Sequence, residues 1–223
     1  MTQTQIPIED LIRRYEQLYL PAVTDVLDRK GYTNQWLGRQ IKPVGPVFRI
    51  AGEAFTVKYA HSLLSSEEKA VEADTRMLDE IRRNHVIVVD NAGNQITGLW
   101  GGMSALVARQ RGVKALVVAG GVRDTSYIIE QGLPIFAEFT SPLDSLGRFK
   151  VVATNVPINI NDVTVYPGDI VVGDMDGIVC VPRAMAEEVL DEAEALVEQE
   201  KKIRNALKNG IPPCDVGKEF GHF

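Results

Sequence analysis

Short apolar runs alternate with amphipathic segments through the middle of the chain. Residues 86–89 and 115–118 are continuous runs rich in β-branched side chains, which is the pattern of strands buried on both faces. Helical spacing predicts helices over about 103–110 and 125–131, and a third apolar run predicts a strand over 134–137. This β-α-β-α-β order predicts parallel strands that are joined by helical crossovers.

The flanking segments have patterns of their own. Residues 8–30 predict two helices separated near Pro21, and residues 54–59 predict a strand. A capping box at 65–68 predicts the start of a helix that continues to about residue 83. Residues 151–182 are rich in short strands and turns. The last element is a long helix over about 183–208, whose acids come early and bases late, as the helix dipole favours.

The sequence shows no internal repeat and no low-complexity tract. A chain of 223 residues is long enough to bury a core without disulfide or metal support. We therefore expect one α/β domain over residues 1–182, with an N-terminal helical segment at 1–31. The C-terminal helix and tail occupy residues 183–223, and we expect them to pack on a neighbouring subunit.

Charge and cysteine content narrow the function classes. The net charge of −6 argues against a general nucleic-acid binder, which usually has a basic excess. Cys180 and Cys214 are too few and too far apart for a disulfide framework or a zinc site. The first ten residues lack a signal-peptide pattern, and no apolar stretch approaches the ~20 residues of a membrane span. We expect a cytoplasmic protein that binds neither nucleic acid nor membrane.

Two strand ends carry the residues of greatest chemical interest, because ligands of open α/β sheets bind beyond the carboxyl ends of the strands. The first is followed by a loop over 90–102 that ends in Gly101-Gly102, directly before a predicted helix. Glycine permits close approach of the backbone, and a helix N-terminus offers free N–H groups to an anion. These glycines either bind a carboxylate or phosphate, or form only a turn and a helix cap.

The second loop, over 120–125, contains Arg123 and Asp124. Arginine presents a planar fork to a carboxylate or keto oxygen, and aspartate is a hard oxygen ligand for Mg²⁺ or Mn²⁺. The alternative is that Asp124 only caps the next helix and Arg123 pairs with a neighbouring acid. Asp174 and Asp176 form either a metal site or, more simply, a turn. No nucleotide-binding loop or serine-hydrolase motif occurs in the chain.

Three stretches together resemble the RraA-like family: residues 88–94, 100–103 and 112–124. Residues 156–157, 167–169 and 174–182 and the acidic helix after them match as well. The family includes 4-hydroxy-4-methyl-2-oxoglutarate/4-carboxy-4-hydroxy-2-oxoadipate aldolases and the regulator of ribonuclease E activity. The resemblance implies a swivelling-type β/β/α fold, with a central sheet flanked by helices and a long C-terminal helix, assembled as a ring-shaped homotrimer or hexamer.

The resemblance also implies a chemistry and a set of site residues. The aldolases of the family use a divalent metal, Mg²⁺ or Mn²⁺, to cleave 4-hydroxy-2-oxo acids to pyruvate, and they decarboxylate oxaloacetate. By this resemblance Arg123 contacts the keto oxygen and carboxylate of the substrate, and Asp124 holds the metal. The backbone around Gly101, Gly102 and Met103 binds the carboxylate. Glu200 of a neighbouring subunit completes the site, with Glu198 as second choice.

The chain departs from the aldolase pattern at Gly102, where those enzymes carry an acid. The loss of that acid affects aldol cleavage more than ligand binding, so we expect decarboxylation to be the more robust activity. The leading hypothesis is a metal-dependent lyase that acts on a 2-oxo acid. The alternative is a non-catalytic interaction protein like the ribonuclease regulator.

Overall fold

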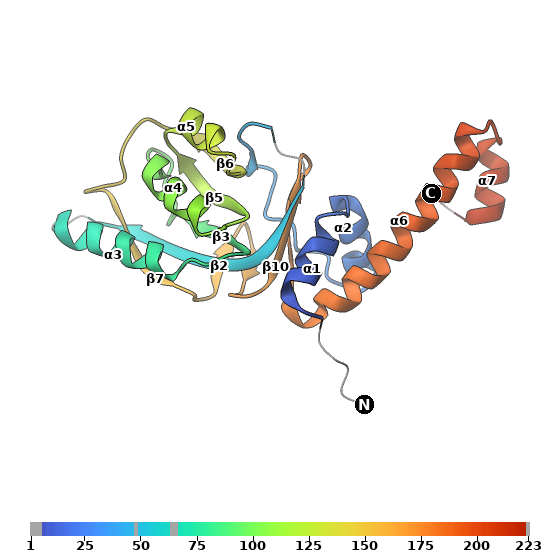
Figure 1. The fold of residues 1–223 in the computed structure, drawn as a ribbon, viewed down its shortest axis with the longest axis horizontal. Helices are drawn as coiled ribbons and strands as arrows, with labels where there is room; N and C mark the ends of the chain where they lie inside the picture. Colours follow the sequence, from blue (N-terminus) through green and yellow to red (C-terminus); the bar gives the residue numbers. More distant parts are fainter. Residues whose placement is uncertain (1–5, 47–48, 63–66, 222–223) are drawn as a thin grey trace.

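The computed structural model describes residues 6–46, 49–62 and 67–221 as a mixed α/β fold with a long C-terminal helix. Figure 1 shows helices α3, α4 and α5 on one side of the main sheet, and α1 and α2 beside the first half of α6. The helices are α1 (Ile8–Tyr15), α2 (Leu20–Arg29), α3 (Glu67–Glu80), α4 (Gly102–Gln110), α5 (Thr125–Glu130), α6 (Ala186–Lys208) and α7 (Pro213–Phe220), with a 3-10 turn, η1 (Arg183–Met185), before α6.

Within the described residues the main sheet has nine strands, in the order β1-β6-β5-β3-β2-β10-β11, while β4 pairs with β5 and β7 with β2. The strands are β1 (Lys42–Pro43), β2 (Arg49–His61), β3 (His85–Asp90), β4 (Gly98–Trp100), β5 (Ala115–Val122), β6 (Ile135–Thr140), β7 (Phe149–Thr154), β10 (Ile170–Asp174) and β11 (Gly177–Val181). A separate hairpin joins β8 (Ile158–Ile160) and β9 (Val163–Val165). The pairs β2–β3, β3–β5 and β5–β6 are parallel, which confirms the predicted crossovers.

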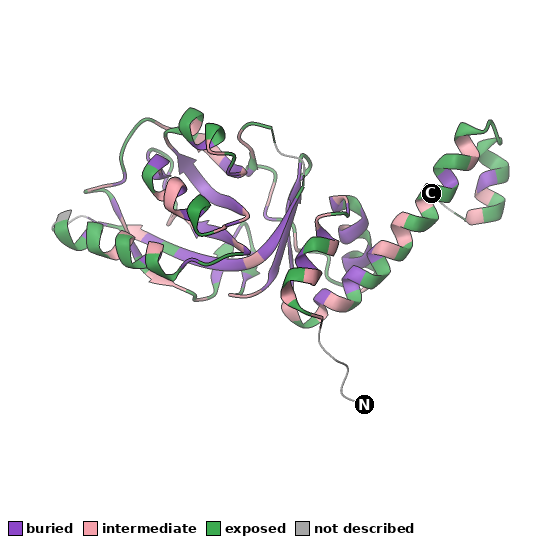
Figure 2. Cartoon of the chain, viewed as in Figure 1, coloured by how far each residue is buried: buried purple, intermediate pink, exposed green. Residues whose placement is uncertain are grey.

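Strand β5 lies in the middle of the sheet and is buried along its whole length. Leu116 and Val118 enter the core beneath α3, α4 and α5, whereas Val117 and Ala119 enter a second core that includes the β8–β9 hairpin. Alternate side chains point to opposite faces of a strand, so both faces of β5 need apolar residues. This explains the continuous apolar run in the sequence, and Figure 2 shows the buried sheet.

The N-terminal helices and the first half of α6 form a third core against the far end of the sheet. Val189, Leu190 and Ala193 of α6 are completely buried there. The hydroxyl of Tyr15 donates a hydrogen bond to the carbonyl of Ala186 at 2.7 Å, and Arg14 pairs with Glu194. The beginning of the C-terminal segment therefore packs on its own chain.

Several elements differ from the sequence-based expectation. Gly98–Trp100, expected within a loop, forms β4, and β5 continues through Val122 rather than ending near Val118. The structure adds β4 beside β5 and shifts the β5–β6 register between Val118 and Gly121, so Gly121 pairs with Gly98 of β4 on one side and with Phe139 of β6 on the other. Helix α7 was not predicted, although Pro213 in its first turn suits a helix start.

Other expectations are confirmed within small shifts of their ends. Helices α1 and α2 lie on either side of residues 16–19, with Pro21 in the first turn of α2. The proposed capping residue of α3, Ser65, lies outside the described residues. Among the described helices, none has the length and apolarity that crossing a membrane requires.

Candidate active site

The end of β5 places Arg123 and Asp124 at the rim of the sheet. The backbone N–H of Arg123 donates to the carbonyl of Trp100 at 2.9 Å, which continues the pairing of β5 with β4. Asp124 follows with a left-handed backbone conformation, φ 56° and ψ 32°. Aspartate tolerates this conformation better than most residues, because its short side chain bonds locally. The chain therefore turns sharply at Asp124 and enters α5.

The carboxylate of Asp124 binds another helix instead of its own. Asp124 is the N-terminal flanking residue of α5, but its side chain makes no capping hydrogen bond there. Its Oδ2 accepts the backbone N–H of Gly102 at 2.9 Å, at the first turn of α4. A carboxylate at a helix N-terminus is stabilised by the unpaired N–H groups and the helix dipole. The interpretation of Asp124 as a simple cap of the next helix is wrong.

Arg123 is paired with two acids. Its Nη1 lies 3.0 Å from Oδ2 of Asp144, and its Nε lies 3.7 Å from Oδ2 of Asp124. Asp144 belongs to the loop after β6, where its Oδ1 accepts the N–H of Leu146. Asp144 was not predicted as a site residue, because it is remote in the chain and its only sequence signal was an acid in a loop after a predicted strand. Arg123 does pair with acids, as the simpler alternative proposed, and its side chain is still one-third exposed.

Gly101 and Gly102 are packed against these same side chains. A Cβ at Gly101 would lie 2.9 Å from Nε of Arg123 and 3.0 Å from Oδ2 of Asp124. A Cβ at Gly102 would lie 2.8 Å from Cδ1 of Tyr127. All three distances are shorter than van der Waals contact, so the glycines make room for residues of the chain itself. The ring of Tyr127 takes the space beside Gly102, the position at which the resemblance to the aldolases implies an acid.

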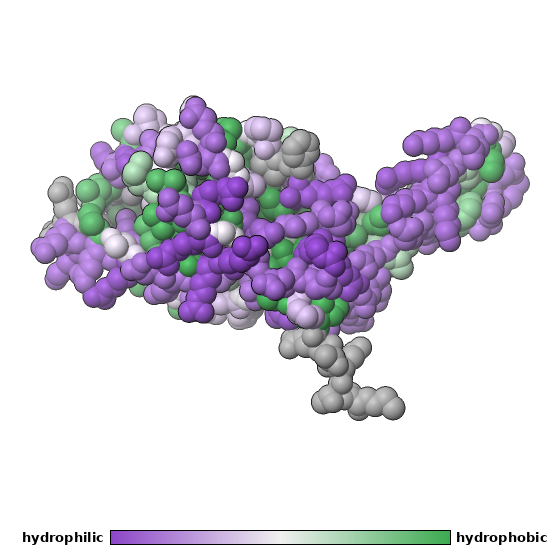
Figure 3. Space-filling model, viewed as in Figure 1, coloured by the Kyte–Doolittle hydropathy of each residue, from purple (hydrophilic) through white to green (hydrophobic). Residues whose placement is uncertain are grey.

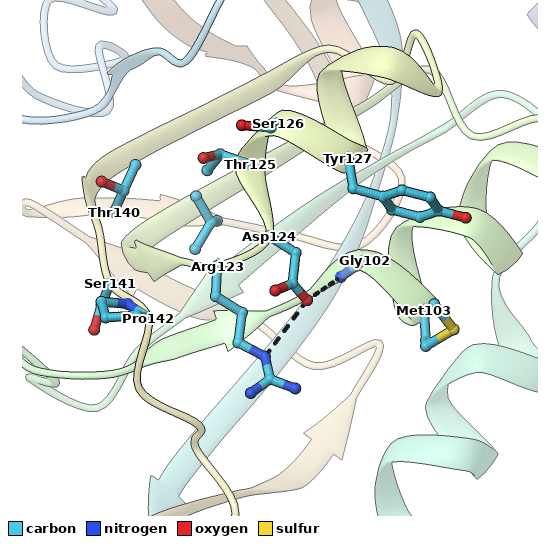
Figure 4. A pocket seen from close by; sticks show the side chains of 11 residues that line it. Gly102, Met103, Arg123, Asp124, Thr125, Ser126, Tyr127, Thr140, Ser141 and Pro142 are labelled. Atoms are coloured by element: carbon cyan, nitrogen blue, oxygen red, sulfur yellow. Dashed lines mark hydrogen bonds and ion pairs between the residues drawn. The ribbon is translucent and has the colours of Figure 1, made fainter.

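A cavity of about 500 Å³ opens beside these residues and is lined by 102–103, 122–127 and 140–142. Figure 4 shows Tyr127 and Met103 on one side of Arg123 and Asp124, and Thr125, Ser126, Thr140 and Ser141 on the other. Within the described residues, the backbone N–H of Met103 has no hydrogen-bond partner. It is the first free helix N–H after Gly102 and suits the carboxylate of a ligand. Gly101 does not line the cavity, so its predicted ligand contact stays a prediction.

Glu200 lies elsewhere in the chain. It is on the second half of α6, pairs with Arg204 and lines a separate cavity between α2 and α6. The structure does not bring Glu200 to Arg123 within one chain. The predicted contribution of Glu200 from a neighbouring subunit, with Glu198 as second choice, remains a prediction.

The described side chains offer few ligands to a divalent cation. They contain no group of three or more His, Cys, Asp or Glu residues that could enclose a metal. Asp124 nevertheless presents a half-exposed carboxylate with Oδ2 bound to Gly102 and no recorded partner in the described structure for Oδ1. Mg²⁺ is commonly held by one or two carboxylates together with water and substrate oxygens. Asp124 fits that kind of water-rich site and does not fit a closed protein cage.

The other residues considered in the sequence have structural partners. Asp174 accepts N–H groups from Leu20 and Asp176, which makes it part of a turn. Cys180 is buried, and burial raises the pKa of its thiol. His85 stacks on Phe55, and burial lowers its pKa. None of these residues lines the cavity beside Arg123.

Comparison with known proteins identifies the class to which this fold and site belong. The RraA-like family, described as Aldolase/RraA, matches residues 20–180. The chain therefore belongs to the RraA-like family.

Individual relatives have several different names. The chain is 30% identical over 84% of its length to protein DlpA of Legionella pneumophila, but it spans only 30% of the length of that protein. It is 28% identical to a protein of Halalkalibacterium halodurans provisionally named 4-hydroxy-4-methyl-2-oxoglutarate aldolase, over 95% of this chain and 93% of that one. The crystal structure of Streptomyces coelicolor RraAS2, described as an unusual member of the RNase ES inhibitor RraA family, aligns with a TM-score of 0.79 at 27% identity, over 91% of this chain and 99% of that one.

Proposed function

We propose that this chain is a divalent-metal-dependent lyase for 2-oxo acids, acting as a 4-hydroxy-4-methyl-2-oxoglutarate-type aldolase, an oxaloacetate decarboxylase, or both. The observation that carries the proposal is the position of Arg123 and Asp124 at one cavity, beside the free N–H of Met103. The aldolase name of the relative from H. halodurans supports the same class of reaction.

The chain's own groups suit a pyruvate-like ligand. The N–H of Met103 binds the carboxylate, and the guanidinium of Arg123 donates to the 2-oxo oxygen and a carboxylate oxygen. Cleavage of the C3–C4 bond leaves its electron pair on C3, delocalised onto the 2-oxo oxygen as an enolate. Arg123 is in place before this charge develops, so it stabilises the enolate without reorganisation. A divalent cation held by Asp124 would supply further positive charge at the same oxygen.

Gly102 affects the two reactions differently. Oxaloacetate loses CO₂ and leaves the enolate of pyruvate directly, so it needs no base for a hydroxyl group. Aldol cleavage must also remove the proton of the 4-hydroxyl group, and Gly102 offers no side chain for that step. We therefore expect decarboxylation to be faster than aldol cleavage.

Steady-state assays with Mg²⁺ or Mn²⁺ on oxaloacetate and on 4-hydroxy-4-methyl-2-oxoglutarate test the proposal. Arg123→Lys keeps the charge but loses the planar fork, and we expect a drop in kcat/KM of roughly a hundredfold, the scale of losing one oxyanion donor. Robust aldol cleavage without oxaloacetate turnover would overturn the expected order. No turnover of either acid with any divalent metal would argue against the function itself.

The assembly that best supports this function is a homotrimeric or hexameric ring with the site at a subunit boundary. The second half of α6 and α7, which we call the C-terminal arm, project away from the rest of the chain in Figure 1. Figure 3 shows hydrophobic side chains among the polar ones on this arm. Packing of the arm on a second copy is the predicted route by which Glu200 reaches Asp124. Light scattering that shows a fully active monomer would exclude it.

The second candidate is a non-catalytic regulator that binds another protein. It is favoured by the similarity to S. coelicolor RraAS2 and by the missing acid at Gly102. A regulator would use its outer surface, so an Arg123→Ala, Asp124→Ala double variant would still capture its partner in a pull-down. Loss of 2-oxo acid turnover in the same variant would instead support the lyase.

A further inference from the structure

The loop that follows β6 carries a second arginine close to the site. Residues 140–142 line the cavity beside Arg123, and Arg148 lies a few residues further along the same loop. Nη1 of Arg148 donates to the carbonyl of Asp144 at 2.9 Å, while Oδ2 of Asp144 lies 3.0 Å from Nη1 of Arg123. One aspartate therefore holds both guanidinium groups, one through its backbone and the other through its side chain.

These two contacts limit the distance between the guanidinium groups. The carbonyl oxygen and Oδ2 of one aspartate lie at most about 6 Å apart, so the Nη1 atoms of Arg123 and Arg148 are separated by at most about 12 Å. A 2-oxo dicarboxylate of four or five carbons spans about 5–6 Å, and a hydrogen bond of about 2.9 Å at each end extends its reach to about 11–12 Å. Such a molecule is long enough to contact both arginines.

The two arginines differ in how far their charge is compensated. Arg123 pairs with Asp144 and Asp124. Arg148 is exposed and forms no ion pair within the described residues, where its side chain contacts only the neutral carbonyl of Asp144. The charge of Arg148 is therefore available to an anion, and the planar fork of arginine suits a carboxylate.

From this arrangement we infer that Arg148 binds the second carboxylate of a 2-oxo dicarboxylate whose 2-oxo end lies at Arg123. The inference rests on the proposed lyase function and assigns a specificity-determining residue to it. Oxaloacetate and 4-hydroxy-4-methyl-2-oxoglutarate both carry such a carboxylate. The loop after β6 thereby positions one contact for each end of the substrate.

The two reactions change this carboxylate differently. Aldol cleavage of 4-hydroxy-4-methyl-2-oxoglutarate breaks the C3–C4 bond, and its electron pair forms the enolate of pyruvate. A proton leaves the 4-hydroxyl group and another reaches C3, so the products are two molecules of pyruvate, and the second carboxylate keeps its charge throughout. In oxaloacetate the second carboxylate loses its charge as it leaves as CO₂. Arg148 therefore stabilises the ground state and the transition state of aldol cleavage alike, but mainly the ground state of decarboxylation.

Arg148→Gln in the full chain, with Mg²⁺ or Mn²⁺, tests the inference. We expect KM for both substrates to rise by roughly five- to tenfold, the scale of one exposed hydrogen bond to a charged group. The kcat of aldol cleavage should stay the same, whereas the kcat of decarboxylation should increase, because only there is the lost contact weaker in the transition state. Unchanged KM for both substrates would overturn the inference and leave the lyase function standing. No turnover of either substrate by the wild type would instead contradict the lyase function.

Binding measurements test recognition without turnover. 2-Oxoglutarate and 2-oxopentanoate share a five-carbon chain and differ in a terminal carboxylate or methyl group, and neither has the 4-hydroxyl group that aldol cleavage requires. Calorimetry with Mg²⁺ is expected to show that the wild type prefers 2-oxoglutarate by roughly five- to tenfold and that Arg148→Gln loses this preference. Equal binding by the wild type would overturn the inference. A preference retained in Arg148→Gln would overturn it as well and would assign the carboxylate to another cation, such as one of a neighbouring subunit.

Two controls separate direct binding from a disturbed Arg123. Oxalate has only two carbons and cannot reach from Arg123 to Arg148, so its inhibition constant should be the same in Arg148→Gln and the wild type. Loss of oxalate binding would show that Arg148 acts through Asp144, which would overturn the direct contact. Arg148→Lys keeps the charge and should restore part of the preference for 2-oxoglutarate. Arg49→Gln on β2 removes an exposed arginine that donates to the carbonyl of Gln17 at 2.9 Å, and this matched change should alter neither KM nor ligand preference.

Discussion

Asp144 fixes the guanidinium of Arg123 from a loop that is remote in the sequence: its Oδ2 lies 3.0 Å from Arg123 Nη1. The loop itself is held in place, because Leu143 accepts the N–H of Gly98 at 3.0 Å and the carbonyl of Asp144 accepts Nη1 of Arg148 at 2.9 Å. Arg123 thus has a defined orientation before any ligand arrives. In the described structure its Nη2 has no recorded partner and is available to a substrate oxygen.

Asp144→Asn should weaken this orientation while keeping the size of the side chain. We expect KM for oxaloacetate to rise by roughly three- to tenfold with a smaller change in kcat, because the pair is partly exposed and charge-assisted. Kinetics and oxalate binding measure the effect. Glu72→Gln, which removes a surface pair with Arg76 on α3, is the matched control. Unchanged KM and oxalate affinity in Asp144→Asn would rule out a positioning role.

Asp124 has a conformational role as well as a chemical one. Asp124→Asn keeps a side chain that tolerates the left-handed backbone and an oxygen for the N–H of Gly102, so we expect near-normal stability with loss of turnover. Asp124→Ala loses both features and should lower the free energy of unfolding by a further ~1–2 kcal/mol. Denaturant unfolding of both variants provides the test. Equal stability of the two would show that the conformation at residue 124 carries no cost.

Restoring an acid at position 102 requires space. Gly102→Asp places its Cβ against Tyr127, so the single variant should lose about 1–3 kcal/mol of stability. Adding Tyr127→Ala removes the ring, and the double variant should recover part of that loss and gain aldol activity relative to decarboxylation. Thermal unfolding and the ratio of the two activities are the measurements. Full stability of Gly102→Asp alone would show that Tyr127 moves aside without cost.

Asp74 on α3 makes stability depend on pH. Burial, and next the charge of Asp144, raise the pKa of Asp74 from 3.8 to about 6. The folded state therefore binds more protons than the unfolded state between about pH 4 and 6, so this group lowers stability as pH rises through that window. Asp74→Asn should be more stable than wild type at pH 7.5 by about 1–3 kcal/mol, and this difference should shrink toward pH 4. A difference that is the same at both pH values in urea unfolding would contradict this assignment.

Much of the architecture could be predicted from local patterns. The apolar runs at 86–89 and 115–118 predicted buried parallel strands, because a strand covered on both faces needs apolar side chains at every position. Proline, glycine and the charge distribution predicted α2 and α6 to within a few residues. Arg123 and Asp124 could be selected as well, since charged residues directly after a buried strand stand out against their surroundings. Helix α7 and strand β4 were not predicted because they are short. Their stability comes from contacts with neighbouring elements, which no local sequence pattern reveals.

The arrangement of the site was decided only in three dimensions. The sequence offered Asp124 as a cap for the helix that follows it, but the left-handed turn at Asp124 directs the carboxylate to Gly102 of α4. Asp144 reaches Arg123 because β6 lies beside β5, and Tyr127 fills the space at Gly102 because α5 packs next to α4. Hydrogen bonds and steric contacts act over a few ångströms, and residues that are distant in the chain come within that range only when the sheet and its helices have assembled.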